Sequence, residues 1–253
     1  FKHKVLYYGP DNISDVKKLM LEVHNTTELI EIIQKDLNVE KEMDSSKVYV
    51  IDYDMKQAEV IMFTKGEKLN NDEYSIIKFH NEYFGGGMSS IVFQDMRESK
   101  ALAYSVYSTF TIPKKSSDSH YGFSYVGTQA DKLGEAMQGM QALLEEMPQA
   151  NSNMETAREG ILQKIRTERI TKNKVLDYYE TFNKMGVNYD KRIDLFNDVV
   201  DFTMEDLTNF HDTHVKNDNY TYMVLGSSNE IDLKLLEKYG EVTILKLEDI
   251  FGY

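Results

Sequence analysis

The sequence contains no cysteine, and no apolar run approaches the roughly 20 residues that a membrane-spanning helix needs. The lack of cysteine excludes disulfides, thiolate zinc sites and cysteine nucleophiles from this chain. No signal peptide opens the chain, so we expect a soluble protein and leave its compartment open between cytoplasm and periplasm. The first residue is Phe1 rather than Met, and residues 4–8 are typical of a strand, so we expect a segment of a longer protein.

Positive charge is also scarce. Lys and Arg together number 29 against 42 Asp and Glu, which gives a formal net charge of −13. Duplex nucleic acid and anionic membranes both require clustered basic side chains, so no nucleic-acid or membrane partner is expected. A basic or neutral peptide would tolerate this negative field better.

Several catalytic motifs are missing as well. The sequence has no G-x-S-x-G, no phosphate loop, no dinucleotide fingerprint and no His-x-x-Glu-His, the inverted zinc motif. The nearest fragments are His80-Asn-Glu82, with a single histidine, and His211-Asp-Thr-His214, whose spacing could hold a metal on one helix face. No carboxylate base stands in the right relation to the second fragment. We therefore predict no metal in this chain and keep a metal role for His211 and His214 only as an alternative.

Two segments at opposite ends of the chain echo each other. Residues 5–19 and 222–236 share Gly, Asn, Asp, an apolar residue, Lys and Leu at matching offsets, and each reads as strand, turn and short helix. Chance likeness between such units is one explanation. We predict instead that residues 1–25 are the tail of a preceding copy of the domain. One repeat pair is too few for a solenoid.

The remaining chain divides into a connector and a main domain. Thr26 or Thr27 can cap a helix running to Leu37, and a polar loop follows, so residues 26–46 are predicted to be a linker helix and loop. The main domain then covers residues 47–253. Its predicted strands are 47–53, 59–64, 104–112, 121–126, 220–225 and a short one near Val242. Its predicted helices include 133–147, 152–165 behind a capping box at Ser152, and one behind a capping box at Thr203.

This order of elements predicts the fold class. Strands are grouped early with hairpin-like links, and most helices follow. The grouping favours an α+β fold with a largely antiparallel sheet covered by helices on one face. Strict βαβ alternation is missing, which argues against a doubly wound parallel sheet.

The most strongly patterned stretch is residues 81–106. It predicts a helix ending in a glycine cluster, a second helix, a tight turn and a strand, with Arg97 near the end of the second helix and Tyr104 near the start of the strand. A guanidinium offers five donors and a phenol one hydroxyl, so the two could hold a peptide carbonyl or a developing oxyanion. The structural alternatives are a charge complementing a helix C-terminus for Arg97 and strand packing for Tyr104.

The stretch resembles the hallmark of the non-catalytic half of insulysin-like zinc peptidases, the pitrilysin family of inverzincins. The matching residues are Gly85-Gly86-Gly87, Ser89-Ser90, Phe93, Arg97-Glu98 and Leu102-Ala103-Tyr104. The likeness runs from about Lys47 to Leu236. One departure is Ala103, where the family often has glycine just before the tyrosine, so less room is left for close backbone approach.

The resemblance implies a two-half clamshell around a chamber. The complementary catalytic half, in the same polypeptide or a separate subunit, would supply zinc and base. This half would close the chamber and contact the peptide substrate through Arg97 and Tyr104, with no catalytic residue of its own. The peptide would add as an extended strand to a sheet edge. Alone, the chain should bind peptides weakly and cut nothing.

Two other functions stay open. Relatives of this fold serve as non-catalytic structural or pairing subunits, such as scaffolds of respiratory complexes and partners of processing peptidases. The presence of both Arg97 and Tyr104 favours peptide binding over pure scaffolding. The remaining alternative is an independent metallohydrolase that uses His211 and His214.

Overall fold

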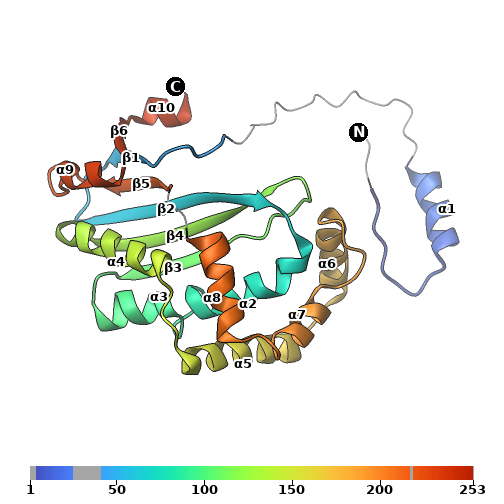
Figure 1. Ribbon diagram of the computed structural model, residues 1–253. Helices are drawn as coiled ribbons and strands as arrows, with labels where there is room; N and C mark the ends of the chain where they lie inside the picture. The colour runs from blue at the N-terminus through green and yellow to red at the C-terminus, as the bar shows by residue number, and fades with distance from the viewer. Residues whose placement is uncertain (1–3, 25–40, 217–218, 253) are drawn as a thin grey trace.

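One six-stranded sheet organises the computed structural model, which describes residues 4–24, 41–216 and 219–252 (Figure 1). The strands are β1 (Lys47–Asp52), β2 (Gln57–Lys68), β3 (Ser105–Phe110), β4 (Ser119–Gln129), β5 (Thr221–Gly226) and β6 (Glu241–Leu245). Their order across the sheet is β3-β4-β2-β5-β1-β6. The pairs β3–β4, β4–β2 and β2–β5 are antiparallel, whereas β5–β1 and β1–β6 are parallel.

Helices cover one face of this sheet, as Figure 1 shows for α2, α4, α5 and α8. The α-helices are α1 (Ile13–Val23), α2 (Tyr74–Phe84), α3 (Ile91–Phe93), α4 (Leu133–Glu145), α5 (Asn151–Thr167), α6 (Lys172–Lys184), α7 (Arg192–Asp198), α8 (Met204–Phe210), α9 (Leu233–Leu236) and α10 (Leu247–Phe251). Short 3₁₀ or π turns are η1 (Asn71–Glu73), η2 (Gln94–Ser99), η3 (Ala130–Lys132), η4 (His211–Val215) and η5 (Glu237–Tyr239). The predicted α+β class, with a largely antiparallel sheet and helices on one face, is confirmed.

Alternating burial along the strands separates the two faces of the sheet. In β2, Val60 and Met62 are buried under the helices, while Ile61 between them is only partly covered. The opposite face carries an apolar row formed by residues that stand opposite one another on five neighbouring strands: Tyr107, Tyr125, Ile61, Met223 and Tyr49. The side chains of this row belong to the face that the helices leave open.

The two predicted capping boxes had different outcomes. Thr203 caps α8 as the sequence predicted: its hydroxyl accepts from Asp206 N, and the Asp206 carboxylate accepts from Thr203 N. The box at Ser152 is wrong, because α5 begins at Asn151 and no side chain caps it. A tertiary contact sets that start instead: the Tyr83 hydroxyl donates to Pro148 O at 2.6 Å and accepts from Ala150 N at 2.9 Å.

The N-terminal segment differs from the main domain in its burial. Residues 4–8, predicted as a strand, form none. Asn12 caps α1 by accepting from Ser14 N, but no side chain of α1 is buried. The predicted linker helix between Thr26 and Leu37 lies outside the described residues. Within the described ranges, no helix combines the length and apolar character needed to cross a bilayer.

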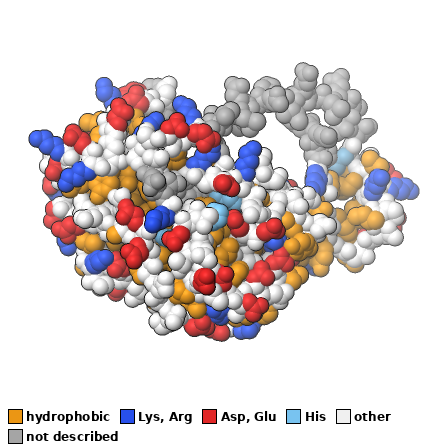
Figure 2. Space-filling view, in the orientation of Figure 1, with side chains coloured by type: hydrophobic (Ala, Val, Ile, Leu, Met, Phe, Trp, Pro, Cys, Tyr) orange, Lys and Arg blue, Asp and Glu red, His pale blue; other side chains and the backbone are white. Residues whose placement is uncertain are grey.

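Charge is distributed without segregation on the face seen in Figure 2. Carboxylates are scattered over this face, and lysine and arginine side chains are interleaved with them. Interspersed charges of both signs produce a weaker long-range field than a single-sign patch would.

The glycine cluster after α2 brings the end of this helix against the edge strand β3. Gly85 O accepts from Ser108 N at 3.3 Å. Asn81 mimics a neighbouring strand, because its side chain accepts from Phe110 N at 2.8 Å and donates to Phe110 O at 2.9 Å. These bonds occupy outward-facing groups of an edge strand, which would otherwise be open to pairing.

We predict that Gly85→Ala destabilises the fold. A β-carbon at Gly85 would lie 2.2 Å from Ser108 O, a backbone atom, whereas one at Gly87 would have nothing closer than 3.8 Å. The expected loss is about 1–3 kcal/mol in the free energy of unfolding, measured by urea denaturation. Gly87→Ala is the matched control and should unfold near the wild-type midpoint. Equal midpoints for the two variants would contradict the close approach.

Candidate functional site

The turn between Arg97 and Tyr104 is shaped by a left-handed residue. Ser90 caps α3, which continues into the π-helical turn η2. Ala101 follows with φ of 49°, a conformation that usually falls to glycine at a helix C-terminus. Leu102 N donates back to Met96 O at 2.8 Å and closes the turn.

The left-handed residue of the turn is not the alanine at which the sequence departs from the family pattern. Ala103, which leaves less room for close backbone approach than glycine would, has no positive φ, and its side chain is buried in the core. The position that favours glycine is Ala101, two residues earlier.

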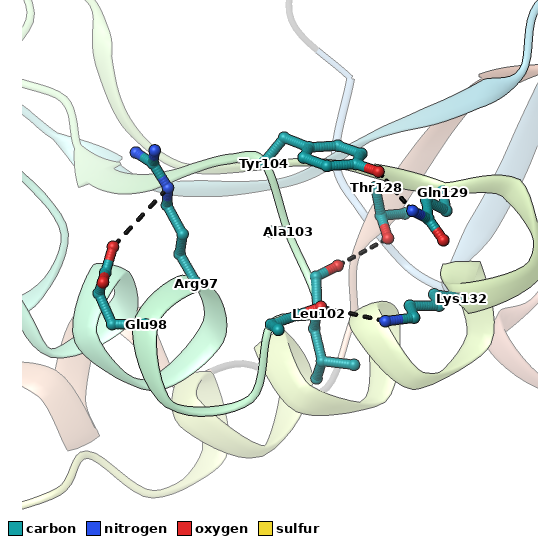
Figure 3. A pocket seen from close by; sticks show the side chains of 9 residues that line it. Arg97, Glu98, Leu102, Ala103, Tyr104, Thr128, Gln129 and Lys132 are labelled. Carbon is teal, nitrogen blue, oxygen red and sulfur yellow. Dashed lines mark hydrogen bonds and ion pairs between the residues drawn. The ribbon is translucent and has the colours of Figure 1, made fainter.

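Arg97 and Tyr104 line the same pocket, of about 340 Å³, beside this turn (Figure 3). The pocket is lined by Arg97, Glu98, Ala101, Leu102, Ala103, Tyr104, Thr128, Gln129 and Lys132. The two predicted site residues come from η2 and from the residue before β3. Both line the pocket from the two ends of a short turn, and Figure 3 shows the Arg97 guanidinium on one side of the view and the Tyr104 hydroxyl on the other.

Arg97 is held by stacking rather than by a strong ion pair. Its guanidinium carbon lies 4.9 Å from the centre of the Phe93 ring, and Nε is 3.8 Å from Glu98 Oε1. The side chain is 47% exposed. An exposed pair at that distance stabilises little, so Arg97 remains accessible to a ligand.

Tyr104 lies outside the hydrophobic core, with 52% of its surface exposed. Its backbone N–H donates to Gly127 O on β4 at 2.8 Å. Its hydroxyl accepts a hydrogen bond from Gln129 Nε2 at 2.5 Å. The ring is anchored by its backbone, and its hydroxyl end lines the pocket.

The end of β4 and η3 contribute site residues that the sequence reading missed. Thr128 Oγ1 donates to Leu102 O at 2.6 Å, and Lys132 Nζ donates to Ala101 O at 3.3 Å. Together with Gln129 they hold the turn from the neighbouring strand. No local pattern marks these residues, because their role follows from the pairing of β3 with β4.

Comparison with known proteins places the chain in a family. The family model described as the Peptidase M16 inactive domain matches residues 5–159. The chain belongs to the M16 peptidase family. The match runs from the N-terminal segment into α5, and so includes the whole turn that carries Arg97 and Tyr104.

A curated relative extends this M16 assignment. The chain is 31% identical over 146 residues to a Bacillus subtilis (strain 168) protein named an uncharacterized zinc protease, YmxG. The match covers 54% of this chain and 34% of that protein, so the chain spans about a third of this relative's length.

Solved structures share the M16 fold. A Helicobacter pylori protease aligns with a TM-score of 0.67 at 14% identity over 85% of this chain and 53% of its own. A peptidase M16 inactive domain from Pseudomonas fluorescens aligns with a TM-score of 0.64 at 15% identity over 75% of this chain and 46% of its own. Pitrilysin aligns with a TM-score of 0.52 at 10% identity over 81% of this chain and 22% of its own.

Of the two histidines considered as metal ligands in this M16 domain, only His211 lies in the core. His211 is fully buried; its Nδ1 lies 3.1 Å from His80 Nε2 and its Nε2 lies 3.0 Å from Leu144 O. Because a carbonyl only accepts, His211 donates a hydrogen bond from Nε2 to Leu144 O and accepts one at Nδ1 from His80 Nε2. His214 lies elsewhere, 3.2 Å from Glu73.

These contacts leave no metal-binding arrangement around His211. Both of its ring nitrogens are engaged, and His214 is not among their partners. Across the described ranges, no group of three or more His, Cys, Asp or Glu side chains could hold a metal ion. The alternative of a metallohydrolase built on His211 and His214 has no support in this arrangement.

We predict an acid-sensitive step in stability from the His80–His211 pair. Burial, and then repulsion from His211, hold the pKa of His80 well below 6.5, and burial lowers the pKa of His211 to about 4. In the unfolded chain both histidines bind a proton below about pH 6.5. In the folded chain they stay neutral in this range, so the unfolded state binds more protons. The free energy of unfolding should therefore fall as pH drops from 6.5 to about 4.

Urea denaturation at several pH values measures this slope. Carboxylates such as Glu168, whose pKa is lowered to about 2 first by the hydrogen bond from Lys174, act in a more acidic window. Replacing His80 and His211 together by leucine should flatten the slope between pH 6.5 and 4. A flat profile in the unmodified chain would rule out the neutral histidine pair.

Proposed function

We propose that this chain is the substrate-binding, chamber-closing half of a zinc-dependent endopeptidase that acts on peptides. The observation that carries the proposal is the joint placement of Arg97 and Tyr104, both about half exposed, on one pocket. Their guanidinium and hydroxyl donors suit a peptide carbonyl or the oxyanion that forms from it. Zinc and the general base would come from a complementary catalytic half.

The family supports this division of chemistry. The matching model describes an inactive domain, and the Bacillus subtilis relative carries the name of a zinc protease. Zinc hydrolysis needs several protein ligands and an activated water. No suitable ligand group is present among the residues that the structure describes. The chain would thus bind and position a peptide that another half cuts.

The closed edge of β3 limits how a peptide binds here. Gly85 and Asn81 already occupy the outward groups of Ser108 and Phe110. An added strand would have to displace these bonds. We therefore propose that this half contacts the peptide through pocket side chains, and that strand addition takes place at another sheet edge.

We further propose that residues 1–25 belong to the sheet of a preceding copy of the domain. The equivalent segment at the other end contains β5, a strand between β2 and β1, and Leu236, which is fully buried. Its counterpart Leu19 is 54% exposed. A preceding domain of the same fold would cover that leucine and give residues 5–8 neighbouring strands.

Arg97→Ala and Tyr104→Phe should each lower peptide hydrolysis by the complex of this chain with its zinc-bearing half. Loss of an oxyanion donor costs about 10²-fold in rate. The chain alone should cut nothing and contain no stoichiometric zinc by metal analysis. Arg169→Ala and Tyr179→Phe, at exposed positions on other parts of the chain, are matched controls. Unchanged rates for both site variants would favour the alternative of a structural or pairing subunit.

Deleting residues 1–24 should leave the stability of the main domain almost unchanged, because α1 buries no side chain. The same deletion should impair assembly with the preceding half, since that half would lose a strand and an apolar helix face. Thermal melting checks the first outcome and co-purification the second. A large drop in melting temperature would show that the segment belongs to this domain instead.

A further inference from the structure

The hydrogen bond from Gln129 to Tyr104 leaves the tyrosine proton free for another acceptor. A phenol has one proton to donate and lone pairs to accept with. Gln129 Nε2 donates to the Tyr104 hydroxyl at 2.5 Å, so the tyrosine proton is not given to Gln129. Figure 3 shows the amide nitrogen of Gln129 facing the hydroxyl, with the amide oxygen turned away.

The backbone around Gln129 is held in place by the sheet. Gln129 is the last residue of β4, paired with Gln57 on β2, and it directly precedes η3. Its neighbour Thr128 is tied to Leu102 O across the turn. The amide therefore comes from a fixed element, which is what a group needs in order to orient another side chain.

We propose that Gln129 is a positioning residue that keeps Tyr104 a hydrogen-bond donor toward the peptide. This inference rests on the proposed function. A peptide carbonyl and an oxyanion have only lone pairs, so Tyr104 assists them only while its proton is free to point at them. A hydrogen-bond acceptor at position 129 would take the hydrogen bond from the Tyr104 hydroxyl. Only the lone pairs of that hydroxyl would then face the lone pairs of the peptide oxygen.

A substitution series at position 129 separates polarity from simple packing. Gln129→Lys keeps a donor, Gln129→Leu removes the hydrogen bond, and Gln129→Glu presents an acceptor. The measurement is kcat/KM of the complex with the zinc-bearing half. We expect Gln129→Lys to stay within a few-fold of wild type, Gln129→Leu to lose more, and Gln129→Glu to lose about 10²-fold, as Tyr104→Phe does.

The pH dependence gives a second readout. A protonated carboxyl can donate to the tyrosine, so the ratio of the Gln129→Glu rate to the wild-type rate should rise as pH falls toward about 4.3. The ratio cancels acid effects on the zinc half. Gln138→Glu, an equal charge change at an exposed position of α4, is the control, and melting curves verify folding of each variant.

The outcomes distinguish this inference from the proposed function. If Tyr104→Phe lowers the rate and the lysine and glutamate variants at position 129 behave alike, the positioning role is overturned while the peptidase function stands. If neither Arg97→Ala nor Tyr104→Phe lowers the rate, the proposed function itself fails. If Tyr104→Phe alone has no effect, there is no tyrosine donor to position and the role of Gln129 is overturned, while the Arg97 contact still supports the proposed function. A graded loss from lysine through leucine to glutamate supports the positioning role, because packing alone does not follow donor polarity.

Discussion

The contact between the end of α2 and the edge of β3 positions the rest of the site. Gly85 approaches Ser108 closely enough that only glycine fits, and Asn81 pairs with Phe110 on both its N–H and C=O. The chain therefore leaves the sheet edge at Gly85 and returns to the same edge at β3. The segment between them, which contains α3 and η2 and carries Arg97, is attached to the sheet edge at both ends.

Side chains from β4 and η3 hold the turn between Arg97 and Tyr104 by hydrogen bonds to its carbonyls. A left-handed alanine costs on the order of 1 kcal/mol, and Ala101 is such a residue. Bonds to Leu102 O and Ala101 O from Thr128 and Lys132 offset this cost, since each hydrogen bond contributes about 1 kcal/mol. These bonds tie the turn to β4 and η3.

Local patterns were sufficient for the fold class and for the two residues on the turn. Alternation and helical stripes located the strands and helices such as α4, and Thr203 marked the start of α8. Arg97 and Tyr104 were predictable because they stand seven positions apart on one turn, so their proximity is a local property. The missing zinc motif could likewise be read directly, since it is a contiguous pattern.

The sequence by itself therefore determined the strands of the sheet, helices such as α4 and α8, the family resemblance and the two residues on the turn, but not α6, α7 or the start of α5. Tertiary structure alone decided the start of α5 at the Tyr83 contact, the left-handed Ala101, the support from Gln129 and the pairing of His80 with His211. The physical reason is distance along the chain. Hydrophobic period and capping act within a few residues, whereas these four features depend on elements that meet only when the sheet and its helices pack together.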